Sequence, residues 1–294
     1  MIKLFKVDFT RILKDKLFLV ACIVGGAFAI VTPLLYQLIF SSLGDPETEE
    51  MLMTMGLSIT AKAQFFEAFS LVNNFGLVLP VLISIVLCKD FSQGTVRNKV
   101  IAGNTRASIF VSMLFTCFCS IFAIIFVHAL LTMIISLIFF PFQNDAFTAA
   151  DLGNFLLSFA FEFLLYMFVA ALVCFLCVAM KNMGLTIVSY VAVIMIMSIV
   201  TSILQIATLV FTDDGSFAKK VVEFLQNINI FNFGMVIGKV DKYTTEQILS
   251  CIFSPLFGAV ALSFLGALKF NKKDLKKKII THRQGGCCFY AIKT

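Results

Sequence analysis

The chain has 294 residues, of which 60% are hydrophobic and 14% are charged, whereas soluble domains carry about 25% charged residues. A soluble fold of this length cannot bury so much apolar surface, so the composition excludes that class. It favours an all-α integral membrane protein. The 35 Phe, five Tyr and absence of Trp predict only a thin aromatic belt at the membrane surface.

Six apolar runs are long enough to span a membrane, because a helix needs about 20 residues to cross about 30 Å of hydrocarbon. The predicted spans are Leu17–Phe40, Leu71–Cys88, Phe110–Phe140, Asn154–Met180, Leu185–Phe211 and Gln247–Leu268. Together with their connectors they occupy nearly the whole chain, so we expect a single membrane domain over residues 1–294. Residues 279–294 form a tail to which the sequence assigns no role.

The basic residues fall mostly on alternate connectors. Of the 23 Lys and Arg, 18 lie in residues 1–16, 89–109, 181–184 and 269–294, and five lie in residues 41–70, 141–153 and 212–246. The positive-inside rule therefore predicts that both termini lie in the cytoplasm. The net charge of +6 follows from this topology and from contacts with inner-leaflet lipids, without any nucleic-acid partner.

The first 16 residues have an amphipathic pattern. Phe5, Phe9 and Ile12 share one helical face and lysines occupy the other, which predicts a helix lying on the inner membrane surface. An ordinary basic flank to the first span is the alternative, and both readings keep this segment on the cytoplasmic side.

A second amphipathic pattern precedes the last span. Residues 217–231 carry apolar side chains at helical spacing, and Ile230–Gly238 is apolar but too short to cross the membrane. We therefore predict a re-entrant helical segment over residues 217–238 on the outer side. Thr244 and Gln247 then form a capping box that starts the last span.

Two ionisable side chains lie well inside the predicted spans, where such groups are functional candidates by default. Glu162 is placed near the outer end of its span, where we expect it to reach water. His128 lies mid-span, where we expect one hydrogen bond to another helix. The intramembrane cysteines have no His at ligand spacing, so packing explains them better than metal binding. The chain has no G-x-x-x-x-G-K-[ST] loop and no paired acid and base, so we predict that it is not an enzyme.

One cytoplasmic connector, Lys89–Arg106, carries a more specific pattern. The stretch from Thr95 to Ile101 is long enough for two helical turns, and Gly103 is typical of a helix stop. With Gly94 on the other side, two glycines bracket a short basic helix. Any cytoplasmic connector tends to be basic, so the bracketed helix is the informative part.

The run Asp90-Phe91-Ser92-Gln93-Gly94-Thr95-Val96-Arg97-Asn98-Lys99, followed by Gly103 and Arg106, resembles the loop of type-2 ATP-binding-cassette permeases, and more narrowly that of the small permeases of Gram-positive bacteria. The resemblance covers the chain up to the tail after Lys278. It implies that the loop is a coupling helix that docks on a separate ATPase subunit. It also implies an assembly of two permease chains, identical or related, with two ATPase copies that bind ATP and Mg²⁺, whereas this chain binds no cofactor.

The coupling residues implied by this resemblance are Asp90, Gly94, Thr95, Arg97, Asn98, Lys99, Gly103 and Arg106. Of these, the three cations Arg97, Lys99 and Arg106 are expected to offer charged contacts to the ATPase surface. The leading hypothesis is therefore the membrane subunit of an ATP-driven exporter in a bacterial cell membrane.

Two other classes stay open from the sequence. One is an ATPase-independent channel or immunity-type membrane protein, and the other is an intramembrane enzyme. Scattered Ser, Thr and Asn within the spans favour an amphiphilic cargo, such as a peptide, a lipid-like compound or a drug. The candidate cargo-pathway residues are Asn73, Asn74, Glu162 and Gln205.

Overall fold

The computed structural model describes residues 2–43, 61–71, 74–139, 149–180, 182–211, 217–232, 237 and 243–272, and its regular elements there are all α-helices. In chain order they are α1 (Ile2–Leu13), α2 (Lys16–Leu43), α4 (Ala61–Phe69), α5 (Asn74–Ser92), α6 (Thr95–Ile101), α7 (Arg106–Phe139), α8 (Ala149–Met180), α9 (Met183–Val210), α10 (Phe217–Ile228) and α12 (Thr245–Asn271). The predicted all-α class is therefore confirmed.

Five of the described helices, α2, α7, α8, α9 and α12, are long and apolar enough to cross a membrane. The pair α5 and α6 meets the same test only when taken together, and the two helices are bent by 54° at the break between them. The protein is thus a multi-pass membrane protein. Each predicted apolar run falls on one of the long helices or on α5, but the count of six crossings stays a prediction.

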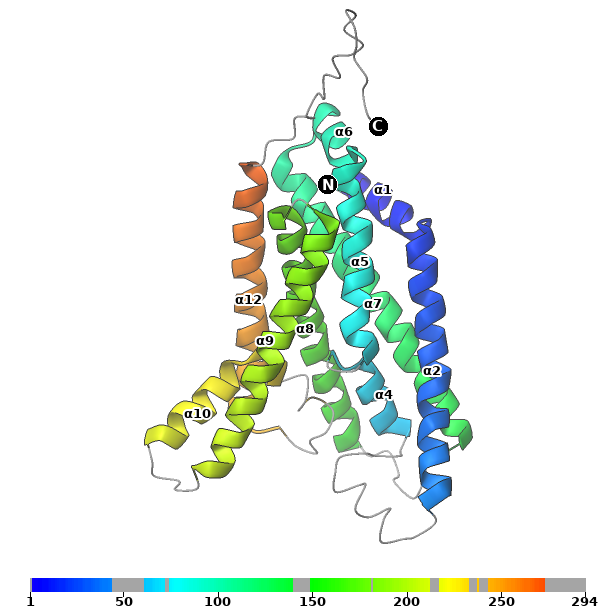
Figure 1. Cartoon of the computed structure of the whole chain (residues 1–294), viewed down its shortest axis with the longest axis vertical. Helices are drawn as coiled ribbons and strands as arrows, with labels where there is room; N and C mark the ends of the chain where they lie inside the picture. The colour runs from blue at the N-terminus through cyan, green and yellow to red at the C-terminus, as the bar shows by residue number, and fades with distance from the viewer. Residues whose placement is uncertain are drawn as a thin grey trace, which may run out of the picture.

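The long helices run side by side, with α1 and α6 at one end of the bundle and α4 and α10 at the other (Figure 1). The start of α7 meets the end of α12 at the first of these ends, where Arg106 Nη1 donates a hydrogen bond to the Asn271 carbonyl at 2.7 Å. We call this end, formed by α1, α6 and the adjoining ends of α5, α7 and α12, the charged end. We call the opposite end the α10 end.

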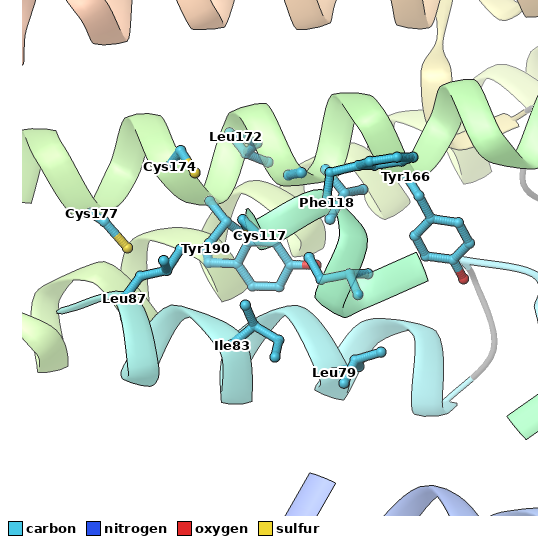
Figure 2. Packing of buried hydrophobic residues seen from close by; sticks show 14 of the residues in the cluster. Leu79, Ile83, Leu87, Cys117, Phe118, Tyr166, Leu172, Cys174, Cys177 and Tyr190 are labelled. Carbon is cyan, nitrogen blue, oxygen red and sulfur yellow. The ribbon is translucent and has the colours of Figure 1, made fainter. Parts of the chain in front are cut away.

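The core lies around α8. In the most apolar stretch of α8, 61% of the residues are buried, compared with 22% in α2 and 17% in both α9 and α12. The peripheral helices therefore expose apolar side chains as lipid-facing helices do. Figure 2 shows Leu79, Ile83 and Leu87 on the face of α5 that is turned toward α8 and Tyr190 of α9.

The helix α4 corrects the prediction that residues 41–70 form only an outer loop. Phe65 and Phe69 are fully buried, and the Phe69 ring stacks on Phe159 of α8 at 5.5 Å between centroids. The hydroxyl of Tyr166 donates a hydrogen bond to the Phe69 carbonyl at 2.8 Å. Nine residues are too few for a clear periodic signal, and such a short helix owes its stability to tertiary packing.

The predicted helix near the N-terminus is confirmed as α1, but its packing differs from a helix that faces only lipid. Ile12 is buried, and the Phe5 ring meets Phe115 of α7 edge-on at 5.1 Å. Asp8 is also buried. The helix therefore presents a mixed apolar and acidic face to the bundle, since its neighbour α7 supplies a hydroxyl for the acid.

The predicted helix before the last span is confirmed as α10. Ser254 of α12 donates a hydrogen bond to the Ile228 carbonyl at 2.6 Å, which ties the end of α10 to the bundle. On α10, the apolar side chains of Phe217 and Phe224 are 82% and 63% exposed. Residues 233–236 and 238–242 lie outside the described part of the chain, so the re-entrant path stays a prediction.

Two local predictions about polar side chains are confirmed. Thr244 Oγ1 accepts from the Gln247 backbone at 3.3 Å, and Gln247 Oε1 accepts from the Thr244 backbone at 3.0 Å, which is the capping box at the start of α12. His128 Nδ1 donates to the Gly25 carbonyl at 2.9 Å and so links α7 to α2.

Candidate functional site

The bracketed helix exists with the predicted bounds. Gly94 and Gly103 adopt left-handed φ angles of 73° and 85°, a region that favours glycine. Between them α6 runs from Thr95 to Ile101 and is anchored by one buried side chain, Val96. The side-chain amide of Asn104 donates to the Lys99 carbonyl at 3.1 Å and closes the end of the helix. The two glycines therefore set the angles at which the chain enters and leaves α6.

A buried ion pair fastens α6 to α1. Lys99 Nζ lies 2.5 Å from Asp8 Oδ1, and the two side chains are only 11% and 4% exposed. Asp8 Oδ2 accepts a hydrogen bond from Ser112 Oγ of α7 at 2.7 Å. A buried charge needs both a counterion and hydrogen bonds to offset its desolvation, and Asp8 receives both. Three helices therefore meet at one carboxylate.

A second pair fastens α1 to the end of α5. The Arg11 guanidinium donates to the Asp90 carboxylate, which is buried. Lys99 Nζ lies 4.0 Å from the same carboxylate, so the cation on α6 is also within ion-pair distance of Asp90. Asp90 thus acts as a connection between elements of the same chain.

A third, more exposed pair lies beside the first two. Asp15 lies between α1 and α2, and Lys89 lies near the end of α5. Lys89 Nζ is 3.1 Å from both carboxylate oxygens of Asp15. Burial tends to raise the pKa of the Asp15 carboxyl, but a hydrogen bond from the Leu17 backbone and the Lys89 charge outweigh it, so the pKa lies below its usual value. The negative form of Asp15 is therefore the one that the fold stabilises.

The predicted coupling residues divide into two groups in the structure. Arg97 and Asn98 are exposed on α6. Lys99 and Arg106, which we expected to offer charge to a partner surface, instead contact this chain: Lys99 at Asp8, and Arg106 at the carbonyl that ends α12. A buried acid such as Asp8 requires a counterion, and the free carbonyls at the end of a helix such as α12 attract a cation.

The remaining members of the predicted coupling set have structural positions. Thr95 is half-buried at the start of α6, Gly94 and Gly103 form its two bends, and Asp90 holds Arg11. Within α6 itself, the exposed residues are Arg97, Asn98 and Ile101, of which Ile101 is 71% exposed.

Of the four candidate cargo residues, the structure describes the side chains of Glu162 and Gln205. Asn73 lies outside the described residues, and the side chain of Asn74, the first residue of α5, does too. Gln205 is exposed on α9. Glu162 was expected to reach water, but it is 1% exposed in the interior of the bundle. The prediction that Glu162 is accessible is therefore wrong, because α8 is the central helix and its neighbours cover this side chain.

The sequence-based predictions missed four residues that form the ion pairs and hydrogen bonds at and beside the charged end: Asp8, Arg11, Asp15 and Ser112. A signal existed for Asp8, since it is the only acid among the basic residues of the first 14. Its partner Lys99 is far away in the chain, and no local pattern links the two. Within the parts of the chain that the structure describes, no three His, Cys, Asp or Glu side chains gather in a way that fits a metal ion.

The fold defines a helical multi-pass membrane protein, and ion pairs between its helices hold the charged end together. A family model described as "Protein of unknown function (DUF2705)" matches residues 18–276, so the chain belongs to that family. No curated protein matches the chain.

Proposed function

We propose that the chain is the membrane-spanning permease subunit of an ATP-driven exporter, with ATP hydrolysed by a separate ATPase subunit. The assembly has two permease chains and two ATPase copies. ATP and Mg²⁺ bind to the ATPase, and the cargo is an amphiphile, such as a peptide, a lipid-like compound or a drug. This proposal rests on the resemblance of the Asp90–Arg106 loop to type-2 ATP-binding-cassette permeases.

The observation that carries the proposal is the form of α6. It is a two-turn helix between two glycine bends, with one buried anchor, an exposed Arg97, and an ion pair to α1. A short rigid helix held in this way transmits a push from a docked partner to α5 and α7 at its ends and to α1 through Lys99. An ordinary connector needs neither the bends nor the buried ion pair.

The topology supports the same proposal. In the six-span arrangement α5 crosses alone, since its 19 residues correspond to about 28 Å at about 1.5 Å per residue. We propose that this end, with both termini, lies in the cytoplasm of a bacterial cell, because the connectors next to it carry the excess of Lys and Arg. The α10 end faces outward, and α10 lies where its exposed Phe side chains enter the outer leaflet.

Isolation of the intact complex tests the proposal. The tagged full-length chain, extracted from its native membranes in mild detergent, should carry a second protein that hydrolyses ATP. Arg97→Glu should lose that protein while remaining inserted, because the reversed charge lies on the docking surface. Lys220→Glu, the same charge change on the exposed face of α10 at the opposite end, is the matched control and should retain it.

The outcomes separate the proposed permease from its alternative. If the wild type and the Lys220→Glu variant purify in equal amounts and neither preparation hydrolyses ATP, the result contradicts the permease and favours an ATPase-independent channel. Orientation is tested independently with an impermeant thiol reagent: a cysteine at Arg97 should react only after the cells are opened, whereas labelling in intact cells contradicts the topology.

A further inference from the structure

One ionisable group in the bundle has no role in the coupling proposal. Glu162 is the only Asp, Glu, Lys or Arg that lies more than three residues inside any of the five candidate spans. It sits in α8, the central helix, and its side chain is 1% exposed. An acid in this position is costly to ionise unless something compensates its charge.

The structure provides no such compensation among the residues it describes. Both carboxylate oxygens of Glu162 are buried without a hydrogen-bond partner there. The two other buried acids behave differently, because Asp8 pairs with Lys99 and Asp90 pairs with Arg11. Glu162 is thus the one fully buried acid in the described chain that the fold leaves without a cation.

The surroundings of Glu162 are well defined. Ser158 and Tyr166 lie one turn before and one turn after it on α8. Ser158 Oγ is 2.6 Å from the hydroxyl oxygen of Tyr243, a residue just before α12. The Tyr166 hydroxyl donates a hydrogen bond to the Phe69 carbonyl at the end of α4. These two contacts tie α8 to the residue before α12 on one side of the carboxyl and to α4 on the other, and neither involves the acid itself.

The ionisable groups around the carboxyl are few and weak. Tyr166 on α8 and Cys251 on α12 are close enough to interact electrostatically with Glu162, and Tyr190 of α9 is close enough to interact in this way with Tyr166. The membrane portions of α5, α7 and α9 have no Asp, Glu, Lys or Arg. The helix α7 contributes His128, which bonds Gly25, and the thiols of Cys117 and Cys119. In α12, Glu246 and Lys269 lie at the two ends of the helix. Among the residues that the structure describes, no fixed cation therefore pairs with Glu162.

We propose that Glu162 is a proton-binding site: its carboxyl carries a proton in the packed bundle and exchanges it with water when α8 and α12 separate at the α10 end. A proton is the one cation that needs no space beyond the carboxyl itself. The contact between Ser158 and Tyr243 lies on this route, since it joins α8, one turn before Glu162, to the residue before α12. The site does not depend on an ATPase and goes beyond the permease proposal.

Infrared spectroscopy of the full-length chain in lipid nanodiscs tests the site. Near neutral pH, the wild type should show the C=O stretch of one protonated carboxyl per chain. Glu162→Gln should abolish this absorption, whereas Glu246→Gln, which removes an exposed carboxyl at the start of α12, should leave it in place. On transfer to D₂O the absorption should shift, because the proton exchanges when the helices separate.

Each result decides the proposal. An absent absorption near neutral pH means that Glu162 is ionised and overturns it. An absorption that survives Glu162→Gln belongs to another acid and overturns it as well. An absorption that never shifts in D₂O shows a permanently buried acid without proton exchange. If Glu162→Gln fails to fold, mapping a hydrophobic carbodiimide adduct on the wild type locates the protonated carboxyl, and an adduct elsewhere overturns the proposal.

Discussion

The charged end and the centre of α8 both bury a carboxylate, but they treat it in opposite ways. At the charged end, Asp8 is closed in by Lys99 of α6 and Ser112 of α7. At the centre of α8, Glu162 is equally buried and has no polar partner among the described residues. Ion pairing is available where connectors rich in lysine and arginine meet, and it is not available within spans that contain no cation.

This difference bears on function. A paired carboxylate holds helices together, and its loss leaves an uncompensated charge inside the protein. An unpaired carboxyl makes no such link between helices, so Glu162 is expected to have a role other than stability. The charged end is therefore expected to respond strongly to mutation in stability, and Glu162 is expected to respond in proton binding.

Removal of the Lys99 charge should have the largest effect. Lys99→Met leaves the buried Asp8 without its cation, which we expect to lower the free energy of unfolding by about 3–5 kcal/mol. Thermal unfolding of the purified chain in detergent measures the change. Arg97→Met removes the same charge from the exposed side of the same helix and should cost no more than about 0.5 kcal/mol.

The double variant Asp8→Asn with Lys99→Met sharpens this result. Removal of both charges should recover a large part of the lost stability, because no buried charge then remains unpaired. Equal and additive losses in the two single variants would contradict the buried pair and would place Lys99 on the surface.

The glycine bends of α6 should have the next largest effect. Gly94→Ala and Gly103→Ala introduce a side chain at φ angles of 73° and 85°, which costs about 1–2 kcal/mol each. An added Cβ meets nothing within 4 Å at either position, so the cost comes from the backbone alone. Gly153→Ala in α8 has the same open surroundings within an ordinary helix and should be neutral or stabilising. A similar loss in all three variants would show that the left-handed backbone is not responsible.

The Lys89–Asp15 pair should contribute less, because Lys89 is about one-third exposed. We expect Lys89→Met to lower stability by less than about 1 kcal/mol at neutral pH. Since the pKa of Asp15 is lowered in the folded chain, this contribution is present at neutral pH and is lost as the pH falls through that lowered pKa. Unfolding measured over an acid series should therefore show a smaller decrease in the variant. An identical pH profile would contradict the pair.

The smallest effect on stability is expected at Glu162. Glu162→Gln removes neither an ion pair nor a hydrogen bond, so the free energy of unfolding should change by less than about 0.5 kcal/mol near neutral pH. Asp8→Asn is the matched comparison, since it also removes one buried carboxylate, and it should be strongly destabilising because Lys99 loses its partner. Equal losses in the two variants would mean that Glu162 is ionised and paired.

Local patterns in the sequence predicted several elements well. Gly94 and Gly103 marked the bounds of α6, and Thr244 and Gln247 marked the start of α12, because the signals for bends and caps lie within a few residues of each other. Apolar length alone located the long helices. Their bounds differ from the predicted ones by a few residues, since polar flanks such as those at the start of α7 continue the helix beyond the membrane.

Other features depend on contacts between distant segments and leave no local pattern. The helix α4 forms because Phe65 and Phe69 find a buried site against other helices. The burial of Glu162 follows from the central position of α8, which depends on how the other helices pack around it. Lys99 was assigned to a partner surface because its position in a basic connector does not show that α1 offers it an acid.

Photo-crosslinking from α6 tests the central claim most directly. A photo-reactive side chain at position 97 of the full-length chain, irradiated in native membranes, should give an adduct with an ATP-hydrolysing protein. The same side chain at position 220 on α10, which is also exposed, should give none. Adducts with that protein from position 220 alone, or from neither position, would contradict the role of α6 as the contact between this chain and an ATPase.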